Sequence, residues 1–377
     1  MAACGDSQAG DTTTAGGTSS TGGSGSTTAS PSSTTAPSDS STAAVDSTGG
    51  VGTSSSEGGS TGGGPTDAGC GECLVLADGL TGGRGIAVDG THVYFSDQSA
   101  GTLARVAKGG GDIEMLATGL EAPYDVVVDG AWVYWTGFVD DGVVARMPIA
   151  GGASEVLDDT TDRPRALAVD DTHVYWTTFG SGSGGVWRAP LAGGSSQNLL
   201  SAYAGIADIV LDGTRFYVTS HDPEPGNGGV TFIEPPPPDD SVGALVSVPL
   251  AGDPDGMQMQ ILATGLAQPW GLATVGDSFV WAHGDGAAAN NPNTIMSLAT
   301  VGGEASVLAS GQMAPWGVAA DASSVYWTDS TEVKSAPHRG GAPVVLATQQ
   351  NEARSIAVDD ASLYWITKNR VLQRPKS

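Results

Sequence analysis

The sequence predicts a seven-bladed β-propeller that occupies residues 70–377. Three observations predict it. A ten-residue phrase recurs seven times, the repeat spacing matches one four-stranded blade, and no segment shows the periodicity of an amphipathic helix. The first copy of the phrase runs from Ile86 to Phe95 and reads IAVDGTHVYF.

The later copies fix the repeat length. They begin at Val126, Leu167, Ile209, Leu272, Val318 and Ile356. One column of the alignment holds Asp89, Asp129, Asp170, Asp212, Val275, Asp321 and Asp359. The steps along this column are 40, 41, 42, 63, 46 and 38 residues, and one propeller blade has this length where no insertion lengthens it.

Each repeat divides into four expected strands. The apolar run before the Asp column predicts a buried inner strand, and the Asp-Gly or Asp-Asp pair predicts a hairpin turn. The Val-Tyr-Trp-Thr phrase predicts the second strand. A third strand follows, as in residues 142–148, and a Gly-Gly turn leads to an outer strand such as residues 114–118.

The two ends of the repeat region complement one another. An unpaired fourth-strand phrase, CLVLADGL, runs from Cys73 to Leu80, whereas the seventh repeat ends after its third strand at residues 371–374. Pairing residues 73–77 with that third strand would give every blade four strands. We therefore expect the N-terminal strand to close the ring and leave no open inner edge.

The first 69 residues predict a disordered tail. They are rich in Ser, Thr, Gly and Ala and contain no aromatic residue, Leu or Ile, so they lack the apolar surface that a core needs. The opening residues MAAC resemble the end of a bacterial lipoprotein signal, which predicts lipidation of Cys4; the alternative is that this cysteine is accidental. Lipidation would anchor the protein without spanning the membrane.

Cys70 and Cys73 form a CxxC pair at the junction of tail and propeller. Structural zinc needs four ligands and no second pair exists, while a redox-active pair belongs to a helix start beside a βαβ unit. We therefore expect a local disulfide, which suits an exported protein.

The net charge of −26 excludes nucleic acid as an expected partner. Six of the acidic residues lie in the tail, which has no Lys or Arg, so the predicted propeller carries a net charge of −20.

Two short motifs point to known repeats. Residues 326–329 read YWTD, with partial copies at residues 134–136 and 175–177, and resemble the YWTD repeat of the low-density-lipoprotein-receptor type. The phrases PWGLA at 269–273 and PWGVA at 315–319 are similar to NHL repeats. The chain has seven repeats where the receptor family has six, and it lacks that family's flanking modules. The resemblance implies the fold and leaves binding scaffolds, lactonases and lyases all open.

The residue five positions before each Asp-column position is expected to line the mouth of the central channel. We call this set the mouth column: Arg84, Tyr124, Arg165, Ala207, Trp270, Trp316 and Arg354. Three guanidiniums, two indoles and a phenol suit an anionic or sugar-like ligand, since Arg pairs with carboxylate or phosphate and aromatic faces stack on rings. The alternative is that these side chains pack between blades.

A weaker set suggests metal. Asp97, His283 and Asp329 end second strands, and Asp285 lies in an insertion that follows His283. That insertion and a longer one at residues 221–240 lie after second strands and supply oxygen ligands that suit Ca²⁺. The alternatives are a structural role for the Asp side chains and ordinary solvated loops. Histidine at 92 and 173 recurs at one hairpin, so neither indicates a site.

These observations favour an exported, lipid-anchored and monomeric protein, located outside the cytoplasm, whose propeller is a non-catalytic binding or scaffolding module. The expected partner is a protein, a carbohydrate or a small anionic ligand, and contact with the membrane is expected only through the anchor. The alternative is a metal-assisted hydrolase or lyase that uses the same loop-bearing face. No catalytic motif is present.

Overall fold

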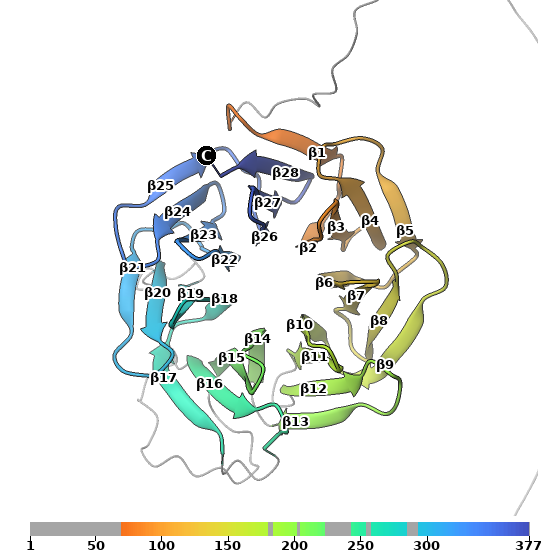
Figure 1. Cartoon of the computed structure of the whole chain (residues 1–377), viewed down its shortest axis with the longest axis horizontal. Helices are drawn as coiled ribbons and strands as arrows, with labels where there is room; N and C mark the ends of the chain where they lie inside the picture. Colours follow the sequence, from red (N-terminus) through yellow and green to blue (C-terminus); the bar gives the residue numbers. More distant parts are fainter. Residues whose placement is uncertain are drawn as a thin grey trace, which may run out of the picture. The chain divides into compact units, whose positions relative to one another are not determined.

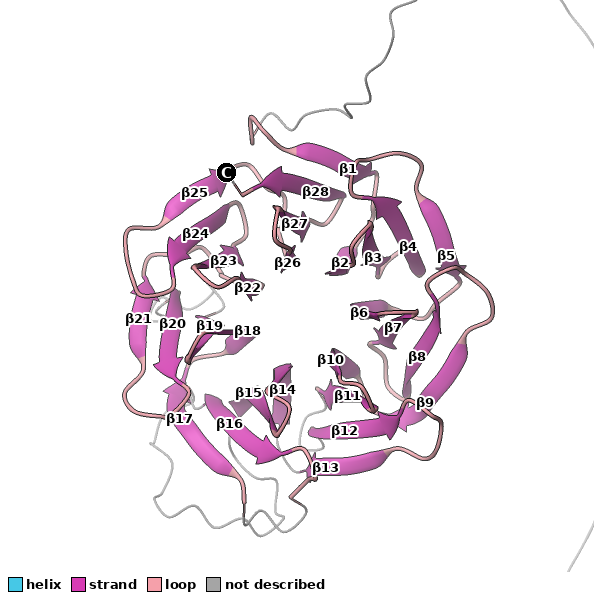
Figure 2. Ribbon diagram, viewed as in Figure 1, coloured by secondary structure: helices cyan, strands magenta, loops and turns pink. Residues whose placement is uncertain are grey.

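A computed structural model describes residues 69–179, 184–201, 204–222, 243–253, 258–284 and 293–376. Within these ranges, 28 strands form seven four-stranded antiparallel sheets arranged around a central channel (Figure 1). The described residues form strands and loops and no helix (Figure 2), and no helix able to cross a membrane is found among them. The predicted seven-bladed β-propeller is confirmed.

The first four blades follow the predicted strand order. Blade 1 holds β2 (Gly83–Val88), β3 (His92–Asp97), β4 (Thr102–Ala107) and β5 (Glu114–Thr118). Blade 2 holds β6 (Pro123–Asp129), β7 (Trp132–Gly137), β8 (Gly142–Pro148) and β9 (Glu155–Thr161). Blade 3 holds β10 (Pro164–Val169), β11 (His173–Thr178), β12 (Gly185–Pro190) and β13 (Gln197–Ser201). Blade 4 holds β14 (Ala204–Leu211), β15 (Arg215–Asp222), β16 (Gly243–Pro249) and β17 (Gln260–Leu266).

The remaining blades complete the ring. Blade 5 holds β18 (Pro269–Val275), β19 (Ser278–His283), β20 (Thr294–Ala299) and β21 (Ser306–Ala309). Blade 6 holds β22 (Val318–Ala320), β23 (Ser324–Thr328), β24 (Val333–Pro337) and β25 (Val344–Ala347). Blade 7 holds β26 (Ser355–Val358), β27 (Ser362–Ile366), β28 (Arg370–Pro375) and β1 (Leu74–Asp78).

The N-terminal strand closes the ring as predicted. β1 pairs antiparallel with β28, and Leu74 faces Gln373 while Asp78 faces Arg370 (Figure 1). The side chain of Leu76 is 4 % exposed within a core that continues into blade 1. Closure therefore joins the two chain ends by both hydrogen bonds and apolar packing.

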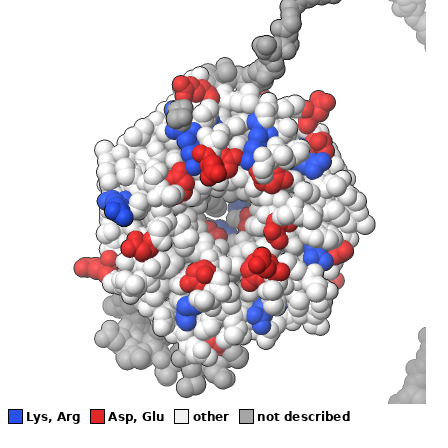
Figure 3. All heavy atoms as spheres, in the orientation of Figure 1, with Lys and Arg blue, Asp and Glu red and all other residues white. Residues whose placement is uncertain are grey.

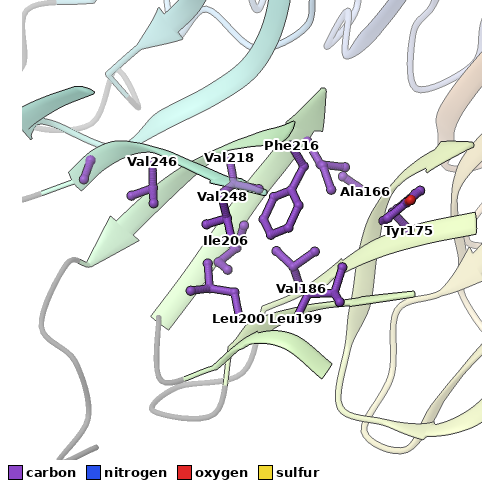
Figure 4. Packing of buried hydrophobic residues seen from close by; sticks show 12 residues of the cluster. Ala166, Tyr175, Val186, Leu199, Leu200, Ile206, Phe216, Val218, Val246 and Val248 are labelled. Atoms are coloured by element: carbon purple, nitrogen blue, oxygen red, sulfur yellow. The ribbon is translucent and has the colours of Figure 1, made fainter. Parts of the chain in front are cut away.

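The core lies between neighbouring sheets. In Figure 4, Phe216 of blade 4 packs against Val186 and Leu199 of blade 3. The Trp of the repeated phrase is buried in the same way in other blades. The Trp365 Nε1 donates a hydrogen bond to Gln350 Oε1 in the preceding blade at 2.9 Å. Neighbouring blades thus stabilise one another through a shared apolar core.

Hydrogen bonds that recur at the hairpin turns explain the Asp column. The Asp89 carboxylate accepts hydrogen bonds from the backbone N–H of Thr91 and His92 and, at 2.7 Å, from the hydroxyl of Tyr94. The same Asp-to-Tyr bond, spanning five residues, recurs in four more blades. It joins Asp170 to Tyr175, Asp212 to Tyr217, Asp321 to Tyr326, and Asp359 to Tyr364.

The other two blades turn differently. Gly130 in blade 2 and Gly276 in blade 5 have φ values of 51° and 57° and make two-residue hairpins. Glycine reaches this conformation without steric cost, so the turn needs no carboxylate to hold it.

These turns define one face of the propeller, which we call the hairpin face. The loops joining first and second strands, for example β10 to β11, lie toward the viewer in Figure 2. Figure 3 shows the same face, with acidic side chains gathered around the opening of the channel. The mouth column belongs to the opposite ends of the inner strands.

Candidate functional site

The mouth column lies where the inner strands begin. Its residues occupy the first part of β2, β6, β10, β14 and β18, or lie one or two residues before β22 and β26. Six of the seven, all except Trp270, line one pocket in the channel. The empty space of this pocket is about 490 Å³, including the part that is open to solvent. The column expected from the sequence therefore coincides with a pocket, and ligand binding there stays a prediction.

Five residues of the column contact one another in a closed circuit. The Arg84 guanidinium lies 4.4 Å from the Tyr124 ring centre, and Nη2 donates a hydrogen bond to the phenol at 2.8 Å. The Arg165 guanidinium lies 5.5 Å from the same ring and 4.6 Å from Trp270. Trp270 stacks on Trp316 at 4.6 Å, and Trp316 lies 5.3 Å from Arg84.

This circuit involves both roles that the sequence left open. Arg84 and Tyr124 come from neighbouring blades, as do Trp270 and Trp316, so the contacts join blades. The same side chains, except for Trp270, also face the pocket. Cation–π contacts hold the guanidiniums in place without neutralising them, which leaves their charge available to a ligand.

The guanidiniums lie near enough to repel one another. Burial is the main cause that lowers the pKa of Arg84, and the charges of Arg354 and Arg165 lower it further, while Tyr124 opposes the shift. Arg165 is 5 % exposed, and Arg354 is held by Glu352 at 2.6 Å. An anion placed among these three cations would relieve their mutual repulsion.

Two polar atoms at the site have no hydrogen-bond partner among the described residues. They are Nε of Arg84 and Nε1 of Trp270, and both are buried. A buried donor without a partner has a cost of about 1–3 kcal/mol, so such groups require an explanation. Arg84 lines the pocket, where an acceptor on a ligand would satisfy its Nε; Trp270 is not part of the pocket lining.

Sequence reasoning missed the aromatic support that Phe138 and Phe179 give the circuit, and it considered His221 only as a site candidate at the start of the longer insertion. Phe138 lies 4.9 Å from Tyr124, and Phe179 lies 4.6 Å from the Arg165 guanidinium. His221 makes an edge contact with Trp270 at 4.2 Å. These three rings occupy one repeat column, nine residues after the Asp column in blades 2, 3 and 4. That shared column was the signal that would have found them.

A second layer of the pocket was also missed. Asp125 and Asp208 follow directly after Tyr124 and Ala207 and line the same pocket. Burial raises the pKa of Asp125 to about 7 and that of Asp208 to about 6. Each side chain keeps some surface open to the channel, but protein atoms surround it closely enough for burial to dominate.

The proposed metal ligands are engaged in other ways where they are described. Asp97 accepts hydrogen bonds from the backbone N–H of Thr81 and Ala100. Asp329 forms an ion pair with Lys334 at 2.7 Å. His283 Nε2 accepts a hydrogen bond from a backbone N–H, and burial lowers its pKa to about 4, so the imidazole is neutral.

These residues are not brought together as a metal centre. Within the described ranges, no group of three or more His, Cys, Asp or Glu side chains is placed to hold a metal ion. Asp285 and most of both insertions lie outside the described residues. The metal set, with the suggested Ca²⁺, stays a prediction.

The cysteine pair lies beside the closure strand. Cys70 and Cys73 form a disulfide and are 3 % and 1 % exposed. Their side chains pack in a cluster with Tyr326 and Trp365, and the carbonyl of Gly69 accepts a hydrogen bond from Thr348 N. The disulfide therefore secures the entry into β1 against blade 6. Cys4 lies outside the described residues.

Comparison with known proteins supports the fold. No protein-family model and no curated protein sequence matches the chain. A solved virginiamycin B lyase from Staphylococcus aureus has a TM-score of 0.64 at 13 % identity, covering 81 % of this chain and 99 % of its own. Kuenenia stuttgartiensis hydrazine synthase has a TM-score of 0.63 at 14 % identity, covering 79 % and 96 %.

A third similar structure is the WD40 propeller domain of Doa1, with a TM-score of 0.60 at 14 % identity, covering 81 % of this chain and 96 % of its own. These likenesses show a β-propeller and do not distinguish a binding module from an enzyme. The resemblance to YWTD and NHL repeats stays a prediction about repeat type.

Proposed function

We propose that this protein is an exported, lipid-anchored binding module that takes a small anionic ligand at the mouth of its propeller channel. One observation carries the proposal: three guanidiniums, those of Arg84, Arg165 and Arg354, line one pocket, and aromatic rings contact the first two. Export and anchoring rest on the sequence, through Cys4 and the disulfide-forming cysteines.

The geometry suits binding because the cationic groups are already in position. Arg84 is fixed by the phenol of Tyr124, and Arg165 is enclosed by Tyr124, Phe179 and Trp270. A ligand therefore meets groups whose side-chain entropy has already been lost in folding, which favours affinity. Charge-assisted hydrogen bonds from Arg to an oxyanion supply the specific part.

Isothermal titration calorimetry of the full chain tests this directly. Acetate, benzoate, glucuronate and inorganic phosphate are suitable probes, since they vary ring and charge separately. We expect at least one to bind, and Arg165→Met to weaken it about tenfold or more. Met keeps the apolar stem against the aromatic rings while it removes the charge.

Arg163→Met is the matched control. Arg163 lies two residues earlier in the chain, pairs with Asp140, is partly solvent-exposed and lies outside the pocket lining. Its variant should bind like the unmodified chain. Absence of binding by all four anions, or equal loss in both variants, would contradict an anion site formed by the mouth column.

Metal content separates this proposal from a metal-assisted enzyme. A purified chain whose melting temperature and anion binding are unchanged by a chelator supports a binding module. A stoichiometric metal ion, lost together with anion binding, would contradict it. Intact mass of the protein extracted from cells tests the anchor, since an unmodified Cys4 would remove that part of the proposal.

A further inference from the structure

The two carboxylates of the pocket are departures from the repeat. Three blades have glycine where blades 2 and 4 have Asp125 and Asp208. At Gly85, an added Cβ would lie 2.4 Å from the carbonyl oxygen of Tyr124 in the next blade. Close approach of neighbouring inner strands therefore favours a small residue here. The two Asp side chains are therefore exceptions at a position where most blades have no carboxylate.

Hydrogen bonds hold both carboxylates in place across a seam between blades. Asp125 accepts from Val126 N at 2.9 Å and from Leu167 N of blade 3 at 2.8 Å. Asp208 accepts in the same way from the backbone N–H of the next residue and, at 2.7 Å, from Leu272 N of blade 5. Each carboxylate oxygen has a further lone pair that these bonds do not use.

The opposite charges of the pocket are close but separate. The charge of Arg165 acts on both Asp125 and Asp208, yet no ion pair joins either carboxylate to Lys, Arg or His among the residues that the structure describes. The pKa of Asp125 is raised first by burial and then by the charge of Asp208. The pocket thus presents three guanidiniums, of which only Arg354 has an acidic ion-pair partner among the described residues, and two carboxylates without a cationic one.

We propose that the ligand is a zwitterion of the α-amino acid class, with its carboxylate at Arg84, Arg165 and Arg354 and its ammonium group at Asp125 and Asp208. This inference rests on the proposed function, because it concerns the same pocket. An ammonium group donates three hydrogen bonds and supplies the cation that two buried carboxylates lack.

A divalent metal fits these carboxylates less well than an ammonium group. Each carboxylate already accepts two backbone hydrogen bonds, and the described residues offer no group of three acidic, His or Cys ligands. Three guanidiniums in the same pocket would also repel a doubly charged ion more strongly than a singly charged one.

A ligand series on the full chain tests the inference. The twenty L-amino acids are titrated singly by calorimetry in mildly alkaline buffer, where both carboxylates are ionised. The amino acid that binds most tightly is then compared with its N-acetyl derivative, which lacks the ammonium group, and with its decarboxylated amine. We expect each change to weaken binding about tenfold or more.

The outcomes separate this inference from the proposed function. Equal binding of the amino acid and its N-acetyl form, or binding of acetate or phosphate but of no amino acid, would overturn the zwitterion and leave the anion site standing. Failure of amino acids and simple anions alike would overturn both. Tight Ca²⁺ binding without amino-acid binding would also overturn the zwitterion.

Asp125→Asn provides an independent test, with Asp140→Asn as control because Asp140 is exposed and lies outside the pocket lining. In Asp125→Asn, the preference for the free amino acid over the N-acetyl form should fall to about threefold or less. In the control it should remain about tenfold, and retention of the full preference in Asp125→Asn would overturn the inference. If thermal melting shows that Asp125→Asn does not fold, the ligand series on the unmodified chain decides.

Discussion

The two ends of the inner strands differ in how far they repeat. At the hairpin face, five blades use the same bond from a Tyr hydroxyl to an Asp carboxylate. At the mouth, the corresponding column holds Arg, Tyr, Ala and Trp in different blades. Side chains that recur in most blades have a structural role that is common to those blades. Side chains that differ around one opening are available for recognition.

Hydrogen bonding of the polar side chains also differs between the hairpin face and the mouth. The Asp89 carboxylate accepts bonds from two backbone N–H groups and two hydroxyls, so little capacity remains. At the mouth, Arg84 and Trp270 each keep a buried donor without a partner among the described residues. The repeated Asp carboxylate is thus nearly saturated with hydrogen bonds, whereas donors without a partner occur at the mouth; at the hairpin end, the hydroxyl of Tyr134 also lacks a partner among the described residues.

Removing the closure strand should have the largest effect on the repeated part. Deletion of residues 70–80 takes away β1 and the buried side chains of Cys73, Leu76 and Ala77, and it leaves β28 as an open edge. We expect the melting temperature to fall by about 10 °C or more. An unchanged melting temperature, measured by circular dichroism, would show that ring closure contributes no stability.

Arg84→Met with Arg165→Met should have the largest effect on the mouth. The double variant removes two of the three guanidiniums while it keeps their apolar stems, so anion binding should fall about a hundredfold. The melting temperature should change by only a few degrees. Unfolding of the variant, detected in the same melting experiment, would instead assign these arginines to packing between blades.

The pH dependence of stability should report separately on the carboxylates at the mouth and on those at the hairpin face. Burial raises the pKa of Asp125 to about 7, whereas hydrogen bonds outweigh burial and lower the pKa of Asp89 and Asp359 to about 2. Between pH 3.8, the ordinary pKa of an Asp side chain, and about 7, the folded chain holds the extra proton on Asp125. That contribution to stability therefore declines as the pH rises through this window.

The hairpin carboxylates act with the opposite sign. Between about pH 2 and 3.8, the unfolded chain holds the extra protons of Asp89 and Asp359, so their contribution is lost as the pH falls. Thermal melts across pH should show both declines. Asp125→Asn should flatten the decline at higher pH only, and an equal change at both ends would contradict the assignment.

A pair of Tyr→Phe changes should have the smallest effect. Tyr364 donates a hydrogen bond to Asp359 at 3.0 Å, whereas Tyr134 has no hydrogen bond to Asp129 in the Gly-type turn of blade 2. Tyr364→Phe should cost about 1 kcal/mol, and Tyr134→Phe should be near neutral. Denaturant unfolding measures both, and equal costs would remove the Asp–Tyr bond as the reason for the repeat.

The sequence was sufficient to predict the fold because the same blade pattern recurs seven times. Spacing gave the number of blades, and the unmatched phrase at residues 73–80 gave the closure strand. The mouth column followed from the same alignment, and six of its seven residues line a pocket. Tertiary contacts were harder to foresee: Asp125 lies inside an apolar strand phrase, where sequence alone does not show that it meets the channel.

Contacts between different columns also escaped sequence reasoning. Phe138 and Phe179 share a repeat column, but their contacts with Tyr124 and Arg165 depend on how the loops after β7 and β11 pack, which the spacing alone does not give. The carboxylates of Asp97 and Asp329 hold local loops instead of meeting across the channel. The repeat alignment predicts the position of a residue within its blade. Its side-chain contacts depend on tertiary packing, which the alignment does not give.

Calorimetric titration combined with thermal melting gives the most direct test of the difference between the two ends. The full chain, Arg165→Met and Tyr364→Phe are compared with the same anion that binds the unmodified chain. We expect Arg165→Met to lose binding and keep its melting temperature, while Tyr364→Phe keeps binding and melts at a lower temperature. Unchanged affinity in Arg165→Met would contradict a binding site at the mouth of the channel.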